Sequence, residues 1–206
     1  MSLIIECQCF PCVGYIEKLI RYKYIKIEQC ESFQKMSFRN RYIILGANGI
    51  QNLTVPVVGG REQKTLIKEV RIDNSTDWQT KHWRSLLSAY SKAPFFNYYS
   101  QDIKDLIYSK EENLFSFNIN ILNWVCNTLR INPVIAFTEE FNLEYSVEDD
   151  CRNYFLPKSF QKVEETFPYY SQVFEDRTGF HPNLSIIDLI LCEGPNSLNL
   201  IRQFSK

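Results

Sequence analysis

The 206-residue chain contains only 7 glycines, 8 prolines and 2 histidines, and it has no long uninterrupted apolar run. Few glycines and prolines together with a hydrophobic fraction of 45% exclude a disordered or low-complexity chain. No run approaches the roughly 20 apolar residues that a transmembrane helix requires. Residues 1–12 also lack the basic-then-apolar order of a secretory signal. We therefore expect a folded cytoplasmic protein without a membrane span.

The chain also lacks an excess of charge of either sign. It has 23 basic and 24 acidic residues and a formal net charge of -1, so it has no overall basic surface for bulk nucleic-acid binding. It contains neither a Walker sequence nor a G-x-G-x-x-G motif, which disfavours ATPases and dinucleotide-dependent dehydrogenases. Any anion site must therefore be local.

The seven cysteines are odd in number and irregularly spaced, which is typical of thiols in a reducing compartment and not of a disulfide framework. Cys7, Cys9 and Cys12 invite a metal interpretation. However, no second Cys or His pair follows at finger spacing, so we expect neither a structural metal nor a bound cofactor.

The first 28 residues predict a parallel βαβ unit. Residues 3–5 and 24–28 have strand patterns, and residues 13–22 between them have apolar side chains at helical spacing. Ligands of such sheets collect at the carboxyl ends of the strands, where Glu6 and Glu28 stand. The length fits one domain, residues 1–206.

The rest of the chain predicts an α/β fold: a mixed, largely parallel sheet flanked by helices, with a β-hairpin insertion and a helical C-terminal half. The Asn48-Gly49 pair indicates the hairpin turn between its two strands. A capping box at residues 76–79 indicates a helix start, and Asn183 is expected to cap a later helix. The predicted hairpin strands are 41–45 and 53–58, the other strands are 68–72, 134–137 and 172–174, and the helices are 76–90, 100–108, 113–129, 184–193 and a last turn or two from 196.

The most informative polar segment is residues 28–41, which follows the second strand. Lys35, Arg39 and Arg41 supply cations, Asn40 an amide and Phe38 a ring. Guanidinium groups suit phosphate oxygens, and a neighbouring aromatic ring can stack on a base or a sugar. The segment therefore predicts a nucleotide-linked ligand; the alternative is a solvated charged loop.

Two histidines are candidate site residues. His82 borders the apolar stripe of its helix, so it is either a hydrogen-bonded packing residue or a general base for an attacking amine. Arg84 lies on the opposite face and contacts an anion only if that face lines the cleft. His181 precedes Pro182, next to a helix start that can bind an anion. Asp188, in an apolar run, should find a partner or carry a raised pKa.

The ordered segments of this chain resemble the WbqC-like protein family of bacterial O-antigen and surface-polysaccharide gene clusters. The resemblance covers nearly the whole chain. The segments are Glu6-Cys7-Gln8-Cys9-Phe10-Pro11 with Gly14-Tyr15, Phe33-Gln34-Lys35-Met36-Ser37-Phe38-Arg39-Asn40-Arg41, Ile44-Leu45-Gly46-Ala47-Asn48-Gly49, Lys81-His82-Trp83-Arg84-Ser85, Pro182-Asn183-Leu184-Ser185 and Glu193-Gly194-Pro195.

The resemblance implies a transferase that adds an acyl or aminoacyl group, most simply glycine, to the amine of a nucleotide-activated amino-sugar. The activated donor is unidentified, and the oligomeric state is open. The expected site comprises Arg39, Arg41 and Lys35 on the diphosphate, Phe10 or Phe38 on the base or sugar, His82 as proton acceptor, Glu6 or Glu28 orienting the amine, Gln8, Tyr15, Asn40, Arg84 and His181 as further substrate contacts, and residues 93–99 as a lid.

Two other functions remain open at this point. The strand, Phe-Pro-x-x-Gly-Tyr turn and helix resemble the first unit of nucleotidylyltransferases, but Val13 and Tyr15 replace the two histidines of their turn. The other alternative is a non-catalytic protein of the same pathway that binds nucleotide-sugars. Release of pyrophosphate distinguishes the first, and ligand stabilisation without turnover distinguishes the second.

Overall fold

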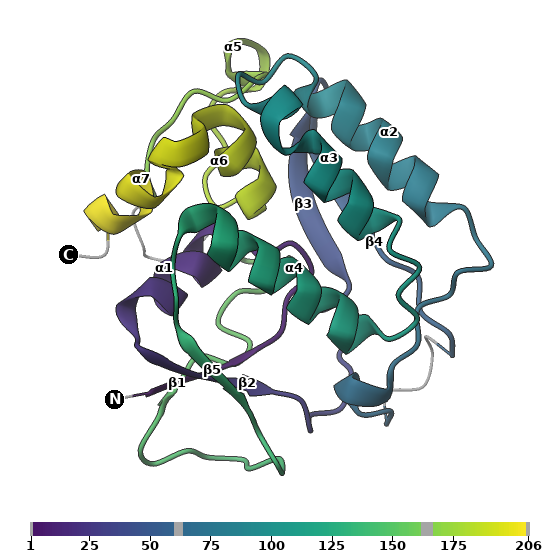
Figure 1. Ribbon diagram of the computed structural model, residues 1–206, viewed down its shortest axis with the longest axis vertical. Coiled ribbons are helices and arrows are strands. Elements are labelled where there is room, and N and C mark those ends of the chain that lie inside the picture. Colours follow the sequence, from purple (N-terminus) through teal and green to yellow (C-terminus); the bar gives the residue numbers. More distant parts are fainter. Residues whose placement is uncertain (1, 60–63, 162–166, 205–206) are drawn as a thin grey trace.

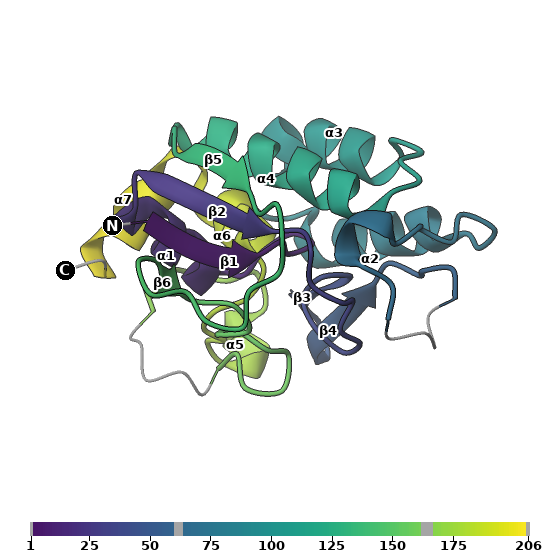
Figure 2. The ribbon, with the colours of Figure 1, turned by 90° about the horizontal axis from the view of Figure 1, so that it is seen from below.

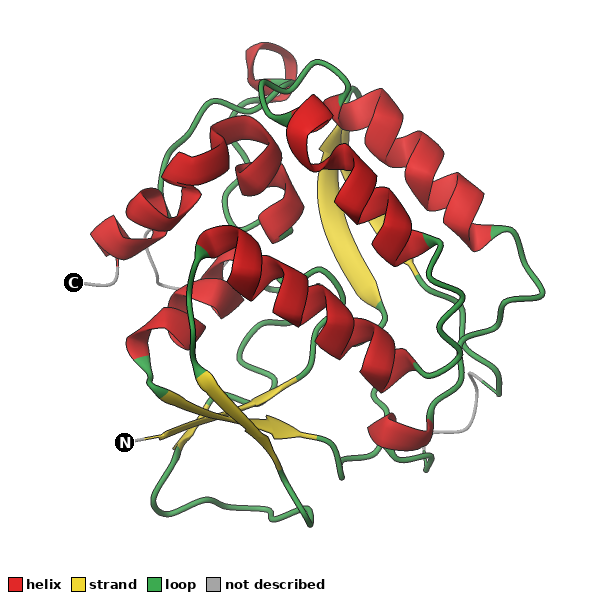
Figure 3. Cartoon of the chain, viewed as in Figure 1, coloured by secondary structure: helices red, strands yellow, loops and turns green. Residues whose placement is uncertain are grey.

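The computed structural model describes residues 2–59, 64–161 and 167–204 (Figures 1 and 3). The strands are β1 (Ser2–Glu6), β2 (Tyr24–Glu28), β3 (Arg41–Gly46), β4 (Gly49–Thr54), β5 (Val134–Phe137) and β6 (Asp149–Asp150). The helices are α1 (Val13–Arg21), α2 (Trp78–Tyr90), α3 (Phe96–Ile107), α4 (Leu114–Leu129), α5 (Glu175–Thr178), α6 (Ile186–Glu193) and α7 (Ser197–Phe204), with 3-10 helices η1 (Ile67–Glu69) and η2 (Gly194–Asn196). None of these helices has the length and apolar composition needed to cross a bilayer.

The main sheet contains four parallel strands in the order β5-β2-β1-β6. β1 and β2 pair in register from Ser2 opposite Tyr24 to Glu6 opposite Glu28, and α1 connects them. Helices α1 and α4 cover one face of this sheet (Figure 1). The α/β fold with a parallel sheet, a separate hairpin and C-terminal helices is therefore confirmed.

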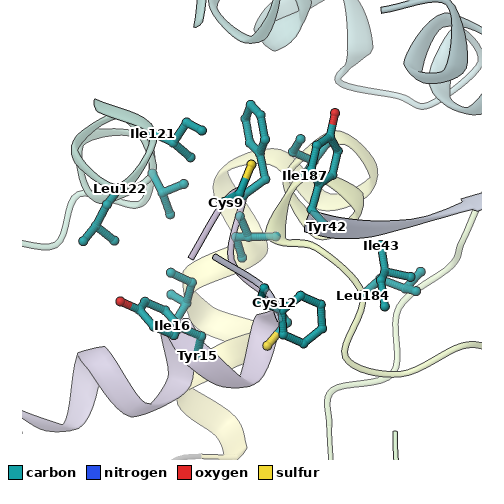
Figure 4. Packing of buried hydrophobic residues seen from close by; sticks show 14 of the residues in the cluster. Cys9, Cys12, Tyr15, Ile16, Tyr42, Ile43, Ile121, Leu122, Leu184 and Ile187 are labelled. Atoms are coloured by element: carbon teal, nitrogen blue, oxygen red, sulfur yellow. The ribbon is translucent and has the colours of Figure 1, made fainter. Parts of the chain in front are cut away.

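Helix α4 is the central helix of the fold, as its broad apolar surface predicts. Asn113 caps it, since its Oδ1 accepts a hydrogen bond from the Ser116 N–H at 2.9 Å. Figure 4 shows Ile121 and Leu122 of α4 facing the same cluster as Tyr15 and Ile16 of α1. Burial of these aliphatic and aromatic side chains holds α4 and α1 together on the sheet.

The hairpin forms at the predicted turn, but its second strand differs from the prediction. β3 and β4 pair antiparallel up to Gly46 opposite Gly49, and Gly49 has a φ of 103°, which favours glycine. β4 begins directly after the turn and ends at Thr54, so the predicted range 53–58 was wrong. The Val55 N–H continues this pairing by one residue, donating to the Asn40 carbonyl at 2.8 Å, and Val57 then forms a bridge to Ile72 instead.

Two predicted strands are absent from the described part of the chain. Residues 68–72 form the end of η1 and then isolated bridges, in which Arg71 pairs with Asn113 and Ile72 with Val57. Because each residue pairs with a different segment, no ladder forms. Residues 172–174 lead into α5, and the amide of Gln172 bonds to the backbone of His181 in place of a neighbouring strand.

Two predicted helix starts are also wrong. The capping box predicted at residues 76–79 does not form: α2 begins at Trp78, Asp77 before it makes no capping bond, and the Thr76 hydroxyl donates to the Asp73 carbonyl at 3.5 Å. Helix α3 begins at Phe96, before the predicted start at residue 100. The predicted lid, residues 93–99, forms the beginning of α3, and Phe96 and Tyr99 are buried in the core. A lid made of core side chains could open only by exposing them to water.

Asn183 has another role than the predicted cap. Ser185 caps α6, with its Oγ accepting from the Ile187 N–H. Asn183 has a φ of 57°, and its Oδ1 accepts from the Gly14 N–H at 2.8 Å, so it binds the first turn of α1. The segment before α6 is thereby fastened to the helix that connects β1 and β2.

Candidate functional site

The carboxyl ends of β1, β2 and β5 bring buried polar side chains together. Glu28, at the end of β2, is fully buried. Its Oε1 accepts from Thr138 Oγ1 at 2.7 Å and from the Cys30 N–H at 2.8 Å. Its Oε2 accepts from Arg152 Nη1 at 3.2 Å and Tyr145 OH at 3.4 Å. The side chain of Glu28 is therefore held in place by donors from three chain segments.

Glu6 is the equivalent residue at the end of β1, and it too is buried. Its Oε1 accepts from Gln8 Nε2 at 2.8 Å, and its Oε2 accepts from the Asn153 N–H at 2.8 Å. The Tyr15 hydroxyl donates to the Glu6 carbonyl at 2.9 Å. Three of the residues singled out from the sequence, Glu6, Gln8 and Tyr15, thus contact one another.

Arg39 forms a buried ion pair with Glu31. Arg39 Nε donates to Glu31 Oε1 at 2.6 Å, Nη2 donates to Oε2, and the residues are only 1% and 3% exposed. Burial raises the pKa of Glu31, against the opposing effect of Arg39. Burial also acts to lower the pKa of Arg39, but the carboxylates of Glu6 and Glu31 raise it above its ordinary value.

A pocket of about 410 Å³ lies beside this ion pair, where β2 ends; we call it the β2 pocket. An acidic residue, Glu31, a basic residue, Lys35, and an aromatic residue, Phe141, are among the residues of its wall. The Arg152 guanidinium lies 5.1 Å from the centre of the Phe141 ring and 4.7 Å from that of Tyr145. The lining residues are Cys30, Glu31, Ser32, Phe33, Gln34, Lys35 and Phe141.

Three buried oxygen atoms near the end of β1 have no hydrogen-bond partner among the described residues. They are Gln8 Oε1, Asn118 Oδ1 and Asn153 Oδ1. Their residues lie around the Glu6 carboxylate and the Arg39 backbone. Gln8 Nε2 and the backbone N–H of Asn153 both donate to Glu6, and Asn118 Nδ2 donates to the Arg39 carbonyl at 2.7 Å. All three are acceptors, so this region suits a group that donates hydrogen bonds.

The other predicted substrate contacts of segment 28–41 bond to groups of the protein itself. Arg39 is committed to Glu31, as described. Asn40 is buried and donates to the Val55 carbonyl at 2.8 Å. The Arg41 guanidinium contacts the Met36 sulfur at 3.2 Å. The binding of a diphosphate by Arg39 and Arg41 and the substrate contact of Asn40 stay predictions, and for Arg39 the role requires a buried ion pair to open.

The predicted stacking rings are core residues. Phe10 is 1% exposed and packs on Tyr42, with ring centres 4.9 Å apart. Phe38 is 3% exposed and packs edge-on against Phe160. Neither ring offers a face to a ligand in this conformation. The ring that does line the β2 pocket and is exposed, Phe141, was not identified from the sequence.

His82 lies in the core between α2 and the hairpin. The Tyr42 hydroxyl lies 3.1 Å from Nδ1, and the Thr54 carbonyl lies 3.2 Å from Nε2. The carbonyl can only accept, so Nε2 carries the proton and Nδ1 accepts from Tyr42. Burial lowers the pKa of His82 to about 4. Its role as a proton acceptor stays a prediction, and the environment is that of a packing histidine.

The buried imidazole makes stability depend on pH. The pKa of His82 is about 4 in the folded chain and near 6.5 when unfolded, so the unfolded state binds the proton first as pH falls. At about 1.4 kcal/mol per unit, the wild type should lose up to about 3 kcal/mol relative to His82→Gln between pH 6.5 and pH 4. Urea denaturation of both proteins across this range measures it. If the free energies of unfolding of the two proteins changed with pH in parallel, the pKa of His82 would be the same in the folded and unfolded states.

Arg84 and His181 lie away from the β2 pocket. Arg84 is exposed on α2 and has no part in the pocket lining. The His181 N–H donates to Gln172 Oε1 at 2.9 Å, and its carbonyl accepts from Gln172 Nε2 at 2.9 Å. His181 Nε2 is buried without a partner among the described residues. His181 therefore belongs to the segment in front of α6.

Sequence reasoning missed Glu31, Thr138, Tyr145 and Arg152. Glu31 stands within the segment 28–41 that was singled out, yet the prediction assigned roles in that segment only to Glu28, the cations, the amide and the ring. Thr138 directly follows the predicted strand 134–137 and could have been found from the rule that placed Glu28. Tyr145 and Arg152 come from an irregular connection after β5, and no periodic signal marks where such a segment folds back.

Two comparisons with known proteins match nearly the whole chain. A family model described as the WbqC-like protein family matches residues 7–200. "Uncharacterized protein Rv1507c" of Mycobacterium tuberculosis is 30% identical over 235 residues, covering 97% of this chain and 98% of that protein. No solved structure matches the chain at a significant level.

Proposed function

The chain belongs to the WbqC-like protein family, and we propose that it transfers an acyl or aminoacyl group, most simply glycine, to the amine of a nucleotide-activated amino-sugar for O-antigen or other surface-polysaccharide assembly. The suggestion of this reaction comes from the family resemblance. The β2 pocket supports it with a chamber at the carboxyl end of a parallel strand, which is where ligands of such sheets bind. Its volume of about 410 Å³ is in the range of small-molecule sites.

The observation that carries the proposal is the position of Glu31. Glu31 is one of the residues that line the β2 pocket, and burial raises its pKa. A raised pKa makes a carboxylate a better proton acceptor near neutral pH. Glu31 combines this property with contact to a pocket, whereas His82 is buried in the core with a lowered pKa.

In the proposed step, the nitrogen of the sugar amine attacks the carbonyl carbon of the activated donor. A C–N bond forms, and the bond between the carbonyl carbon and the donor's leaving group breaks. The leaving group departs with the electron pair of that bond. The proton lost by the amine passes to the Glu31 carboxylate, which Arg39 keeps in place. The products are an amide on the sugar and the free leaving group.

The other residues bind and orient the substrate. Lys35 is exposed at the pocket wall and supplies positive charge for a phosphate. Phe141 offers a partly exposed ring to a base or a sugar face. Glu6 and Glu28 are buried at the ends of β1 and β2, and one of them is assigned the role of orienting the amine, next to the unpartnered acceptor oxygens of this region.

The direct test incubates the purified protein with a nucleotide-linked amino-sugar and candidate glycyl and other acyl donors. Mass spectrometry should detect the acyl mass increment on the sugar. No increment with any donor, in protein that binds the nucleotide-sugar, would identify a binding protein and overturn the transferase proposal. Pyrophosphate release from a nucleoside triphosphate and a sugar phosphate would identify nucleotidyl transfer instead.

Replacing Lys35 with alanine should weaken binding of the nucleotide-sugar without affecting the fold. Losing one charge-assisted phosphate contact of about 1.5–3 kcal/mol should raise KM for the nucleotide-sugar about tenfold or more and leave kcat nearly unchanged. Calorimetry with UDP, a probe that carries the diphosphate alone, should show the same loss in Kd.

Lys92→Ala is the matched control, because Lys92 is also exposed but does not line the β2 pocket. It should bind UDP like the wild type. If the wild type and both variants bound UDP with equal affinity, the nucleotide-sugar would not bind in the β2 pocket.

A further inference from the structure

The outer edge of β5 is available for pairing. β5 is the end strand of the order β5-β2-β1-β6, and Figure 2 shows it at the border of the sheet. Its inner edge bonds to β2: the Val134 N–H donates to the Lys23 carbonyl at 2.8 Å, and the Thr138 N–H to the Ile27 carbonyl at 3.1 Å. Since backbone groups alternate along a strand, those of Ile135 and Phe137 point to the open edge.

Within β5 itself this edge carries no charged side chain, no proline and no bulge. Charged side chains, prolines and bulges within an edge strand normally prevent pairing with other chains. The sequence of β5 is Val-Ile-Ala-Phe, and Val134 and Phe137 are 50% and 43% exposed. In residues 2–59, 64–161 and 167–204, no strand pairs with the outer edge. The edge is therefore apolar and has free hydrogen-bonding groups.

We propose that β5 pairs antiparallel with β5 of a second copy of the chain, so that two sheets join into one across a two-fold axis. The axis passes beside Ala136, which faces the partner's Ala136. Ile135 then lies opposite the partner's Phe137, and both exchange their outward N–H and C=O groups. Alanine suits the axis because side chains of a non-hydrogen-bonded pair lie close together.

The neighbouring register is poorer. With the axis at Ile135, Phe137 would face the partner's Pro133, which has no N–H to donate. The two-fold axis repeats this pair, so each copy's Pro133 would leave one hydrogen bond unformed, and two would be lost in all. The position of Pro133 thus disfavours an axis at Ile135 relative to one at Ala136.

Charge at the two ends of β5 favours a second copy as the partner. Exposed Lys23 and Arg130 lie near its start, and exposed Glu139 and Glu140 follow its end. An antiparallel arrangement brings the acidic end of one copy to the basic end of the other, twice. A parallel arrangement would oppose like charges.

The face of the sheet beside this edge adds apolar area. A hollow of about 460 Å³ is lined there by eight residues of β1, β2, β5 and the segment before β6. Val134 and Ala136 form its β5 side, and Val147, which is 76% exposed, lies opposite. The two-fold axis would place the hollows of the two copies next to each other on one face, extending the apolar surface across the pair.

The test uses charges at the axis. Sedimentation of the wild type over a wide concentration range should show a reversible dimer of twice the chain mass of 24.4 kDa. Ala136→Lys and Ala136→Glu should each raise the dimer Kd by about tenfold or more, since like charges would face each other at the axis. Mixing the two variants should restore dimers, because opposite charges then meet. This rescue also shows that both variants are folded.

Val58→Lys is the control, since Val58 is 58% exposed and lies outside β5. It should dimerise like the wild type. A monomeric wild type at all concentrations, or variants that dimerise alone as well as mixed, would overturn the proposal.

Discussion

Replacing Arg39 with methionine is expected to lower the free energy of unfolding by about 3–5 kcal/mol, because Glu31 would be left as a buried carboxylate without its cation. Arg39 and Glu31 are 1% and 3% exposed, so little solvent would compensate. Methionine keeps most of the side-chain volume and removes the charge. Urea denaturation at neutral pH, with far-UV circular dichroism as the readout, measures the difference.

Two further variants establish the cause. Arg84→Met makes the same change on the exposed surface of α2 and should alter stability by less than about 0.5 kcal/mol. The double variant Glu31→Leu with Arg39→Met removes both charges and should recover a large part of the loss. If Arg39→Met kept wild-type stability and only raised KM for a nucleotide-sugar, the diphosphate role predicted from the sequence would replace the structural one.

Much of the fold follows from local patterns. Two strands and an intervening helix in 28 residues leave only a parallel crossover, and the apolar alternation of residues 24–28 fixes which side chains enter the core. Apolar side chains cover much of the circumference of residues 113–129, which predicts a helix buried at the centre of the fold. The predictions failed where neighbours distant in the sequence decide the backbone, as in residues 68–72, whose partners lie near 57 and 113.

The candidate site was only partly predictable for a related reason. The rule that ligands bind at strand ends identified Glu6 and Glu28, and it depends on topology alone. Which cation can contact a ligand depends on which side chain is exposed, and the pattern of charges in the sequence does not reveal burial. Arg39 and Lys35 look alike in the sequence, yet the first is buried against Glu31 and the second is exposed at the β2 pocket.

Asp188 is expected to be the second residue whose loss is severe. It is fully buried in α6. Its carboxyl accepts from Tyr90 OH at 2.7 Å, Tyr170 OH at 2.7 Å and Gln172 Nε2 at 3.1 Å. The sequence predicted a partner such as arginine or a raised pKa, and the structure gives neutral donors and a pKa that burial raises. The carboxyl thereby connects α6 to α2 and to the segment before α5.

Asp188→Ala should lower the free energy of unfolding by about 4 kcal/mol, because each buried donor left without an acceptor costs about 1–3 kcal/mol and relief of carboxylate burial offsets only part. Asp188→Asn keeps an acceptor oxygen and should cost far less. Asp176→Ala, at an exposed position, is the control and should change stability by less than about 0.5 kcal/mol. Equal losses in the alanine and asparagine variants would mean that the charge, and not the acceptor oxygens, stabilises this region.

The pH dependence of these variants gives an independent check. Because the pKa of Asp188 is raised in the folded chain, the folded state takes up its proton before the unfolded state as pH falls. The stability of the wild type relative to Asp188→Asn should therefore increase as pH falls from neutral toward the ordinary value of 3.8, and decrease as pH rises again. The opposite trend would mean that the three donors lower the pKa more than burial raises it, and that Asp188 is a stabilising charge.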